Sequence, residues 1–381
     1  MNIMEQDFNW VNDTCEKIMN KMATSIHKNE GKIPYSTDEC GVFDDRSSDS
    51  KLMWWTNGFW EGMLWLMYMK TGDAYYCDLE NKMEEVLDRV LLGKTETGID
   101  GLHHDVGFMW LLSSVANYRL TGNTRSRARG LIAANYLSSR FNIKGNYLVA
   151  WNGKERQGWS IIDSMMNIPL LYWAAKETGY HRYLDIAMAH ADKTLNNVIR
   201  PDGSVIHIIN YDTVTGEVLE TLAGQGYEEG SSWTRGQAWA IYGFALSYLH
   251  TKEQRYLDTA KKVSHYFLSA VADYDYIPPI DFRSPKEPLL IDTTAGAIAA
   301  CGLLEIAKHV QEVEKDMYLI GALKILKALT KQHCDFTVHT DSILQNGSEA
   351  YHGKRHLSII YGDYYYMEAM FRLSGLEIEM W

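Results

Sequence analysis

Asp105 and Asp163 are the residues of this sequence best placed to do chemistry. Asp105 follows two consecutive histidines in HHDVGF, and Asp163 stands between apolar runs in IIDSMMNIP. If Asp105 were only a helix N-cap, it would not require two histidines beside it. Burial among apolar residues should raise the pKa of Asp163 towards that of a proton donor. Both aspartates are therefore candidates for acid–base chemistry.

Other polar residues occupy similar positions, at or just before the start of a predicted apolar helix. Arg235 in WTRGQAW is the one guanidinium among them. It can hold a carboxylate through two parallel hydrogen bonds, or it can bridge to a nearby aspartate. We interpret Asp292 in IDTTAGA and Asp363 in YGDYYY as ordinary N-caps. The set is Asn57, Asp105, Asp163, Arg235, Asp292 and Asp363.

Histidines and tryptophans gather in the same segments. His103, His104 and His207 lack the HxxxH or His-x-x-Glu spacing of metal sites, so we expect neither a metal nor another cofactor. Tryptophan faces can pack in a core or stack on the apolar faces of sugar rings, and we expect both uses here. The tryptophans near the helix starts are Trp55, Trp60, Trp151, Trp159, Trp233 and Trp239.

These positions recur because two kinds of helix alternate along the chain, at a period of roughly 50 to 70 residues. One kind is apolar on nearly all sides, which is typical of a helix buried all round. The other has one apolar stripe, as in 183–199, and is typical of a surface helix. The apolar helices are predicted at 59–70, 107–120, 164–178, 236–251, 295–311 and 364–373. Their partners are predicted at 5–26, 76–92, 125–141, 183–199, 256–271 and 317–333.

Helices of these two kinds bury their apolar faces only by stacking side by side. The economical closed arrangement is an inner ring inside an outer ring, so we predict an all-α (α/α)6 barrel forming one catalytic domain, 1–381. An open right-handed solenoid is the competing arrangement. In the barrel all inner helices start at one end, which brings the polar residues to one mouth. Pro169 should stand in the first turn of its helix, which leaves Asp163 just outside it. The strand-like stretch 205–211 is expected in a loop.

Composition excludes several classes of function. The net charge is −12 without a basic run, which argues against nucleic acid as a partner. The five cysteines lack CxxC spacing and are interpreted as reduced thiols. The N-terminal MNIMEQDFNWVNDTC does not resemble a secretory leader, and the apolar stretches are too short to span a membrane. We therefore expect a cytoplasmic protein, with no membrane association.

Several long segments resemble the unsaturated glucuronyl hydrolases of glycoside hydrolase family 88. They are WTNGFWEGMLWL, HHDVGF, IIDSMMNIPLLYWA, GSSWTRGQAWAIYGFALSY, TAGAIAACGLLEIA and YGDYYYMEA, and they span nearly the whole chain. The resemblance implies the same barrel and a small unsaturated oligosaccharide as substrate. It also implies removal of a 4,5-unsaturated uronate from the non-reducing end by hydration of the C4=C5 vinyl ether.

The resemblance implies roles for individual residues. Asp163 matches the general acid/base, and Asp105 matches the second carboxylate, which holds ring hydroxyls. Paired carboxylates push their pKa values apart, so that one is protonated near neutral pH. The segment 342–360 matches least well, and in the family this region selects for sulfation; Ser348, His352 and Lys354 are candidates to meet a sulfate. Contacts to the uronate are implied for Trp55, His104, Phe108, Trp151, His207, Gln225, Arg235 and Trp239.

Two other functions compete with this one. Unsaturated rhamnogalacturonyl hydrolases share the barrel and the chemistry but act on pectin fragments; HHDVGF and the surroundings of Gln225 favour the glucuronyl side. A non-catalytic sugar-binding barrel is disfavoured because both carboxylates are present. A toroidal prenyltransferase or terpene cyclase is disfavoured because a zinc-type Cys/His set and a DxDD motif are both missing. Preference among hyaluronan, chondroitin and heparin products, preference for sulfation, and the oligomeric state stay open.

Overall fold

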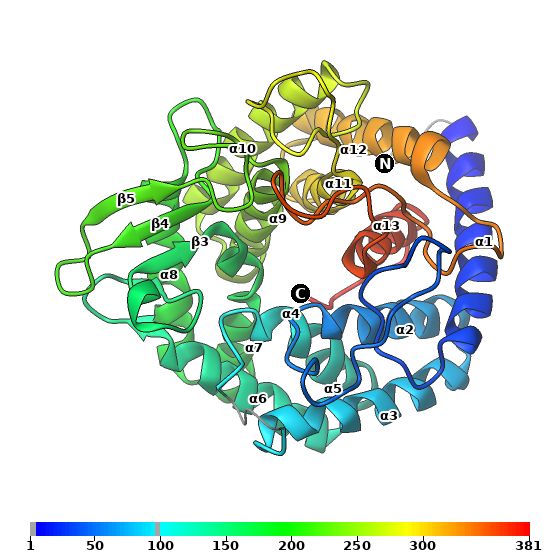
Figure 1. Ribbon diagram of the computed structural model, residues 1–381, viewed down its shortest axis with the longest axis horizontal. Helices are drawn as coiled ribbons and strands as arrows, with labels where there is room; N and C mark the ends of the chain where they lie inside the picture. Colours follow the sequence, from blue (N-terminus) through cyan, green and yellow to red (C-terminus); the bar gives the residue numbers. More distant parts are fainter. Residues whose placement is uncertain (1–4, 96–99) are drawn as a thin grey trace.

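The helices form two concentric rings in the computed structural model, which describes residues 5–95 and 100–381 (Figure 1). The inner ring consists of α2 (Asn57–Thr71), α4 (Val106–Trp110), the π-helical turn η1 (Leu111–Val115), α5 (Ala116–Thr121), α7 (Pro169–Thr178), α9 (Thr234–Thr251), α11 (Thr293–Ala307) and α13 (Ile360–Leu373). The outer ring consists of α1 (Glu5–Lys28), α3 (Ala74–Leu91), α6 (Thr124–Ser139), α8 (His181–Val198), α10 (Gln254–Ala272) and α12 (Glu312–His333).

The inner ring is closed. Helix α13 packs against α11 on one side and against α2 on the other, so the chain returns to where it began. Each inner segment also packs against an outer helix, as α9 does against α10 and α11 against α12. The prediction of an all-α (α/α)6 barrel is confirmed, and the contact between α13 and α2 excludes the open solenoid. The assignment of 1–381 to one catalytic domain stays a prediction.

Burial explains why the two kinds of helix differ. Every residue of α11 is buried, whereas α8 buries one stripe that includes Tyr183, Ala187 and Ala191. Several inner helices are followed by a left-handed residue that lets the chain reverse: Gly72 (φ 72°) caps α2 and Gly179 (φ 73°) caps α7. Each of these glycines follows a threonine, Thr71 or Thr178, that is the last residue of its helix.

The predicted helix 164–178 begins five residues later than expected, at Pro169. Proline lacks an N–H and disfavours the helical conformation of the residue before it, so it occupies the first helical position. Residues 162–166 form a separate 3-10 turn, η3 (Ile162–Met166). Asp163 therefore lies outside α7, as the position of Pro169 predicts.

Short strands lie outside the helical rings. Strands β1 (Phe141–Asn142) and β2 (Tyr147–Leu148) form one antiparallel pair. Strands β3 (Trp159–Ile161), β4 (Ile208–Tyr211) and β5 (Val218–Leu222) form an antiparallel sheet in the order β3-β4-β5. Residues 208–211 form part of this sheet, so the expectation that 205–211 lies in a loop is wrong for these residues. The sheet positions the site, because Asp163 lies two residues after the end of β3 and His207 directly precedes β4.

The two aspartates interpreted as N-caps behave differently. The Asp292 carboxylate accepts from the backbone N–H of Thr294 at 3.2 Å and caps α11. For Asp363 the N-cap prediction is wrong, because this residue lies inside the first turn of α13. Its carboxylate accepts from the backbone N–H groups of Ile343 and Leu344, which are buried and need an acceptor.

Two predictions based on composition can be compared with the structure. All five cysteines are free, which agrees with the interpretation as thiols. Among the described helices, none is long and apolar enough to cross a membrane. Residues 1–4, which belong to the segment compared with secretory leaders, lie outside the described residues.

Glu61 on α2 carries a testable consequence for stability. It is fully buried, and neither carboxylate oxygen has a hydrogen-bond partner among the described residues. Burial, with a contribution from Glu84, raises its pKa to about 8. The folded chain therefore keeps a proton that the unfolded chain releases above about pH 4.3, so this group costs stability increasingly as pH rises to 8.

We expect Glu61→Gln to be more stable than the wild type at pH 8, by roughly 2–4 kcal/mol. The gain should shrink to less than about 1 kcal/mol at pH 4.5, where the folded carboxyl is neutral and the unfolded one is still about half protonated. Urea unfolding of both proteins at several pH values measures it. A gain of equal size at pH 4.5 and pH 8 would contradict the assignment of the effect to a buried proton.

Candidate active site

The polar residues at the inner-helix starts gather at one mouth of the barrel. Asp105 precedes α4, Asp163 precedes α7, and Asn167 connects them. The Asn167 Nδ2 atom donates to Asp105 Oδ1 at 3.1 Å and to the backbone carbonyl of Asp163 at 3.2 Å. The two aspartates are therefore neighbours linked through Asn167, and their charges act on each other. Sequence reasoning did not single out Asn167, although it is a polar residue in the same apolar segment, four positions after Asp163.

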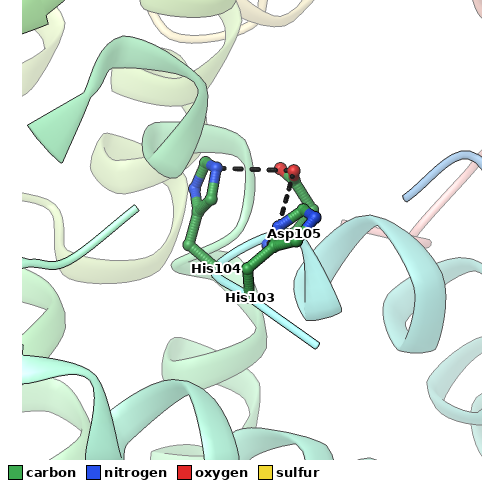
Figure 2. A group of neighbouring side chains, drawn as sticks. All are labelled: His103, His104 and Asp105. Atoms are coloured by element: carbon green, nitrogen blue, oxygen red, sulfur yellow. Dashed lines mark hydrogen bonds and ion pairs between the residues drawn. The ribbon is translucent and has the colours of Figure 1, made fainter. Parts of the chain in front are cut away.

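Asp105 is surrounded by hydrogen-bond donors. Figure 2 shows His103 and His104 converging on its carboxylate: His103 Nδ1 lies 3.1 Å and His104 Nε2 lies 3.4 Å from Asp105 Oδ2. The Ser164 hydroxyl holds the other ring nitrogen of His104 at 2.9 Å. Burial alone would raise the pKa of Asp105, but the contacts with His104, His103 and Asn167 lower it below the ordinary value. Asp105 is therefore charged at neutral pH.

Asp163 has the opposite surroundings. Its side chain is 12% exposed, and its Oδ2 atom has no hydrogen-bond partner in the described part of the chain. Burial, followed by the charge of Asp105, raises the pKa of Asp163 to about 7; the charge of Arg235 opposes the rise. A carboxyl with this pKa can give and take a proton near neutral pH. The two aspartates thus hold opposite protonation states, as expected of an acid–base pair.

His207 faces Asp163 across the mouth. Its Nε2 atom lies 3.6 Å from Asp163 Oδ2, too far for a direct hydrogen bond. Its Nδ1 atom lies 2.9 Å from the backbone nitrogen of Gln225, which can only donate. The same Nδ1 atom lies 3.1 Å from the backbone carbonyl of Ala223, which can only accept, so the two contacts favour opposite tautomers. Burial lowers the pKa of His207 to about 3, so the imidazole whose Nε2 atom faces Asp163 is neutral.

An open cavity of about 340 Å³ lies beside this pair. Its walls include Trp151 and Trp159, whose rings meet at 67° with centroids 6.0 Å apart. Such a pair of flat faces, close to two carboxyls, suits a sugar ring. The cavity is lined by Trp151, Arg156, Trp159, His207, Ile208, Gly224 and Gln225.

Aromatic rings close the floor of the mouth. Phe108 is buried between Trp55, at a centroid distance of 5.3 Å, and Trp239, at 5.2 Å. Trp239 is fully buried, whereas Trp55 is partly exposed. This floor is apolar, and an apolar floor favours the neutral form of Asp163.

Arg235 is held inside the protein. Its side chain is 2% exposed, and it pairs with Asp292 at 2.5 Å and donates to the backbone carbonyl of Glu349 at 2.7 Å. Of the two uses that the sequence leaves open, the bridge to an aspartate is therefore realised. Its charge still influences the site, because it acts against the raised pKa of Asp163.

The three candidates for sulfate binding do not line the cavity beside Trp151. Ser348 is buried, and its hydroxyl donates to the carbonyl of Ile291 at 2.8 Å. Lys354 lines a different hollow, together with Asp38. A ring nitrogen of His352 lies 2.8 Å from the carbonyl of Tyr227. Their part in substrate binding stays a prediction.

The side chains of Figure 2 also have the composition of a metal site. Ligand atoms of His103, His104 and Asp105 lie within 4.8 Å of one another. His103 Nδ1 lies within hydrogen-bond distance of the carboxylate, and Ser164 holds the other nitrogen of His104, so the arrangement does not require a metal. The expectation of no metal stays a prediction.

Comparison with known proteins places this site in a family. A sequence model of Glycosyl Hydrolase Family 88 matches residues 15–369. The chain belongs to glycoside hydrolase family 88. It is 38% identical to the unsaturated glucuronyl hydrolase of Bacillus sp. (strain GL1), covering 92% of this chain and 93% of the relative.

One further sequence relative and one solved structure support the assignment of this chain to family 88. It is 37% identical to the unsaturated chondroitin disaccharide hydrolase of Streptococcus pneumoniae, covering 84% of this chain and 81% of the relative. Its structure matches that of an unsaturated glucuronyl hydrolase variant with dGlcA-Glc-Rha-Glc, with a TM-score of 0.89 and 32% identity over 98% of both chains. The family resemblance inferred from the sequence is confirmed, and the chain is a glycoside hydrolase.

Proposed function

We propose that this family 88 member is an unsaturated glucuronyl hydrolase, which releases 4,5-unsaturated glucuronate from the non-reducing end of lyase-generated glycosaminoglycan disaccharides. The observation that carries the proposal is the pair of aspartates at one mouth: Asp163 with a pKa raised to about 7, and Asp105 with a pKa below its ordinary value. The names of the relatives, which include a chondroitin disaccharide hydrolase, support the substrate class.

The proposed reaction follows from the different protonation states of Asp163 and Asp105. Asp163 protonates C4 of the C4=C5 vinyl ether, and a water adds its oxygen to C5 while it returns a proton to Asp163. The hemiketal formed at C5 opens at the ring oxygen. C1 is then a hemiacetal carbon, which releases the second sugar. Because Asp163 regains its proton, the enzyme is unchanged after each turnover.

The neighbouring residues bind and orient in this proposal. Charged Asp105 accepts hydrogen bonds from the ring hydroxyls and keeps the proton on Asp163. The neutral imidazole of His207 faces the same carboxyl, with Nε2 at 3.6 Å, and is placed to hold the attacking water. Trp151 and the partly exposed Trp55 stack on the sugar faces, and the buried Phe108 supports Trp55 from beneath. The uronate carboxylate binds on the side of the mouth nearest Arg235. The positive charge of this buried arginine attracts it.

A substrate panel tests the proposed activity. Loss of absorbance from the conjugated double bond should be seen with unsaturated hyaluronan, chondroitin and heparin disaccharides, and not with unsaturated rhamnogalacturonan disaccharide. Turnover of the pectin-derived substrate alone would favour the rhamnogalacturonyl alternative. Binding of the disaccharides without turnover would favour the non-catalytic sugar-binding alternative.

Lys354 tests the proposed role of segment 342–360 in sulfate recognition. This segment packs on the site, because Gln225 Nε2 donates to the carbonyl of Glu349 at 2.5 Å. If the lysine meets a sulfate on the second sugar, Lys354→Ala should lower kcat/KM several-fold for sulfated disaccharides only, which is the effect of losing one exposed ion pair. An equal effect on unsulfated disaccharides, or none on either, would contradict that role.

We also propose that the enzyme works in the cytoplasm on small oligosaccharides. Five unpaired cysteines, two of them buried, are typical of proteins in a reducing compartment. Labelling of intact and lysed cells with a thiol reagent that does not cross membranes, followed by recovery of the protein, tests this location.

A further inference from the structure

Segment 377–381 enters the barrel from the end opposite to the candidate active site. Figure 1 shows the C-terminal end of the chain inside the rings of helices. Ile378, Met380 and Trp381 are buried, whereas Glu377 and Glu379 are exposed. The segment is anchored to the far ends of the inner helices, since Arg119 in the last turn of α5 donates to the backbone carbonyls of Glu379 and Trp381.

Trp381 reaches the aromatic floor beneath the site. Its side chain is 2% exposed, and its indole N–H donates to Glu368 at 2.9 Å. Its ring is parallel to that of Tyr365, with centroids 5.8 Å apart, and meets the edge of Phe108 at 6.1 Å. Tyr365 in turn contacts Trp239 at 5.6 Å. Trp381 therefore supports two rings of the floor: it contacts Phe108 directly, and it contacts Trp239 through Tyr365.

The opposite side of Trp381 faces a polar cavity. This cavity has a volume of about 260 Å³ and is lined by Trp381 together with charged side chains at the ends of the inner helices, such as Arg119, Lys176 and Lys308. A cavity of this size with polar walls holds water. Trp381 thus stands between that water and the apolar floor of the active site.

We propose that Trp381 is a positioning residue that seals the barrel axis against water from the far end and keeps the floor beneath Asp163 dry. The inference rests on the proposed function, in which Asp163 is the proton donor. Burial is the first cause of the raised pKa of Asp163, so water in the axis would lower that pKa. The seal would therefore set the pH range in which the donor is protonated.

Charges close to Asp163 do not include any group of segment 377–381. Asp105 acts from the start of α4, Arg235 from the first turn of α9, and neutral His207 lies ahead of β4. On the far side, the partner of the indole, Glu368, is itself paired with Arg372 at 2.9 Å. Loss of the indole therefore leaves the charges around Asp163 in place. Any change in its titration must come through hydration or displacement of the floor.

The experiment compares the pH dependence of kcat/KM on an unsaturated disaccharide, which reports pKa values of the free enzyme. In Trp381→Ala the basic limb should move towards acid by about one pH unit. Trp381→Phe keeps an aromatic ring on Tyr365 and loses only the bond to Glu368, so it should keep the wild-type limb. A matched control is Trp173→Ala: Trp173 lines the same far cavity but packs against Tyr118. This variant should lose stability and keep the wild-type limb.

An unmoved limb in folded Trp381→Ala would overturn the inference, and so would an equal shift in Trp173→Ala. If Trp381→Ala does not fold, Trp381→Gln takes its place, because glutamine fills more of the axis than alanine and its amide draws water beside Tyr365; an unmoved limb there also overturns the inference. Failure of the proposed function looks different, since the wild type would then show no turnover, or Asp163→Asn would keep it. A wild type without a basic limb near neutral pH would refute the premise that Asp163 needs a dry floor.

Discussion

Asp163→Asn should lower kcat by roughly a thousandfold or more, because the variant has no proton to give to C4. The amide has the size of the carboxyl, and Asp163 makes its backbone contact with Asn167 through the main chain, which the change does not alter. The variant should therefore fold and still bind the disaccharide. Stopped assays with high enzyme concentration measure the residual turnover, and calorimetry measures binding.

A control for this variant is Asp363→Asn. Asp363 is also a buried aspartate in an inner-helix start, but its carboxylate serves the backbone of Ile343 and Leu344. The control should lower the free energy of unfolding by about 1–3 kcal/mol and leave kcat of the folded protein near the wild-type value. If Asp163→Asn kept wild-type turnover, Asp163 would be removed from the mechanism.

Asp105→Asn should lower kcat roughly a hundredfold and also change the pH profile. The loss of rate follows from the loss of a charged acceptor for the ring hydroxyls. The pH effect has a definite sign. Protonated Asp163 is the active form, so activity falls as pH rises through its pKa, which is about 7. The charge of Asp105 helps to raise that pKa, so without it the fall should begin at lower pH.

A comparison with Asn167→Ala separates these two effects of Asp105. Asn167 donates to Asp105 Oδ1, so its removal loosens the carboxylate but leaves its charge. This variant should lose activity and keep the basic limb close to that of the wild type. A basic limb in Asp105→Asn that stays in place, or that moves to higher pH, would mean that the two carboxylates do not act on each other.

Much of the site could be predicted from the sequence because its parts are local. Asp105 with its two histidines, and Asp163 in its apolar segment, were recognisable from their immediate neighbours. Pro169 correctly placed Asp163 outside its helix. Asn167 was missed, because an asparagine in an apolar segment signals a polar contact without indicating its partner, which lies 62 residues away in Asp105.

Other assignments failed or stayed open because they depend on distant segments. Asp363 was expected to cap its own helix. Its carboxylate instead accepts hydrogen bonds from the buried backbone N–H groups of Ile343 and Leu344. The partner of Arg235 could not be predicted, since Asp292 stands 57 residues away. The role inferred here for Trp381 has no signal in its neighbours along the chain.

The sequence by itself determined the architecture and the residues offered for chemistry. Hydrophobic periodicity states how many sides of a helix are buried, and alternating helices of two kinds bury their faces best in two rings. Only the tertiary structure decided the protonation state of the residues at the mouth. Protonation depends on burial and on charges a few ångströms away, and the closed ring sets both. Asp105 and Asp163 are the same residue type near the start of similar helices; their surroundings lower the pKa of Asp105 and raise that of Asp163 to about 7.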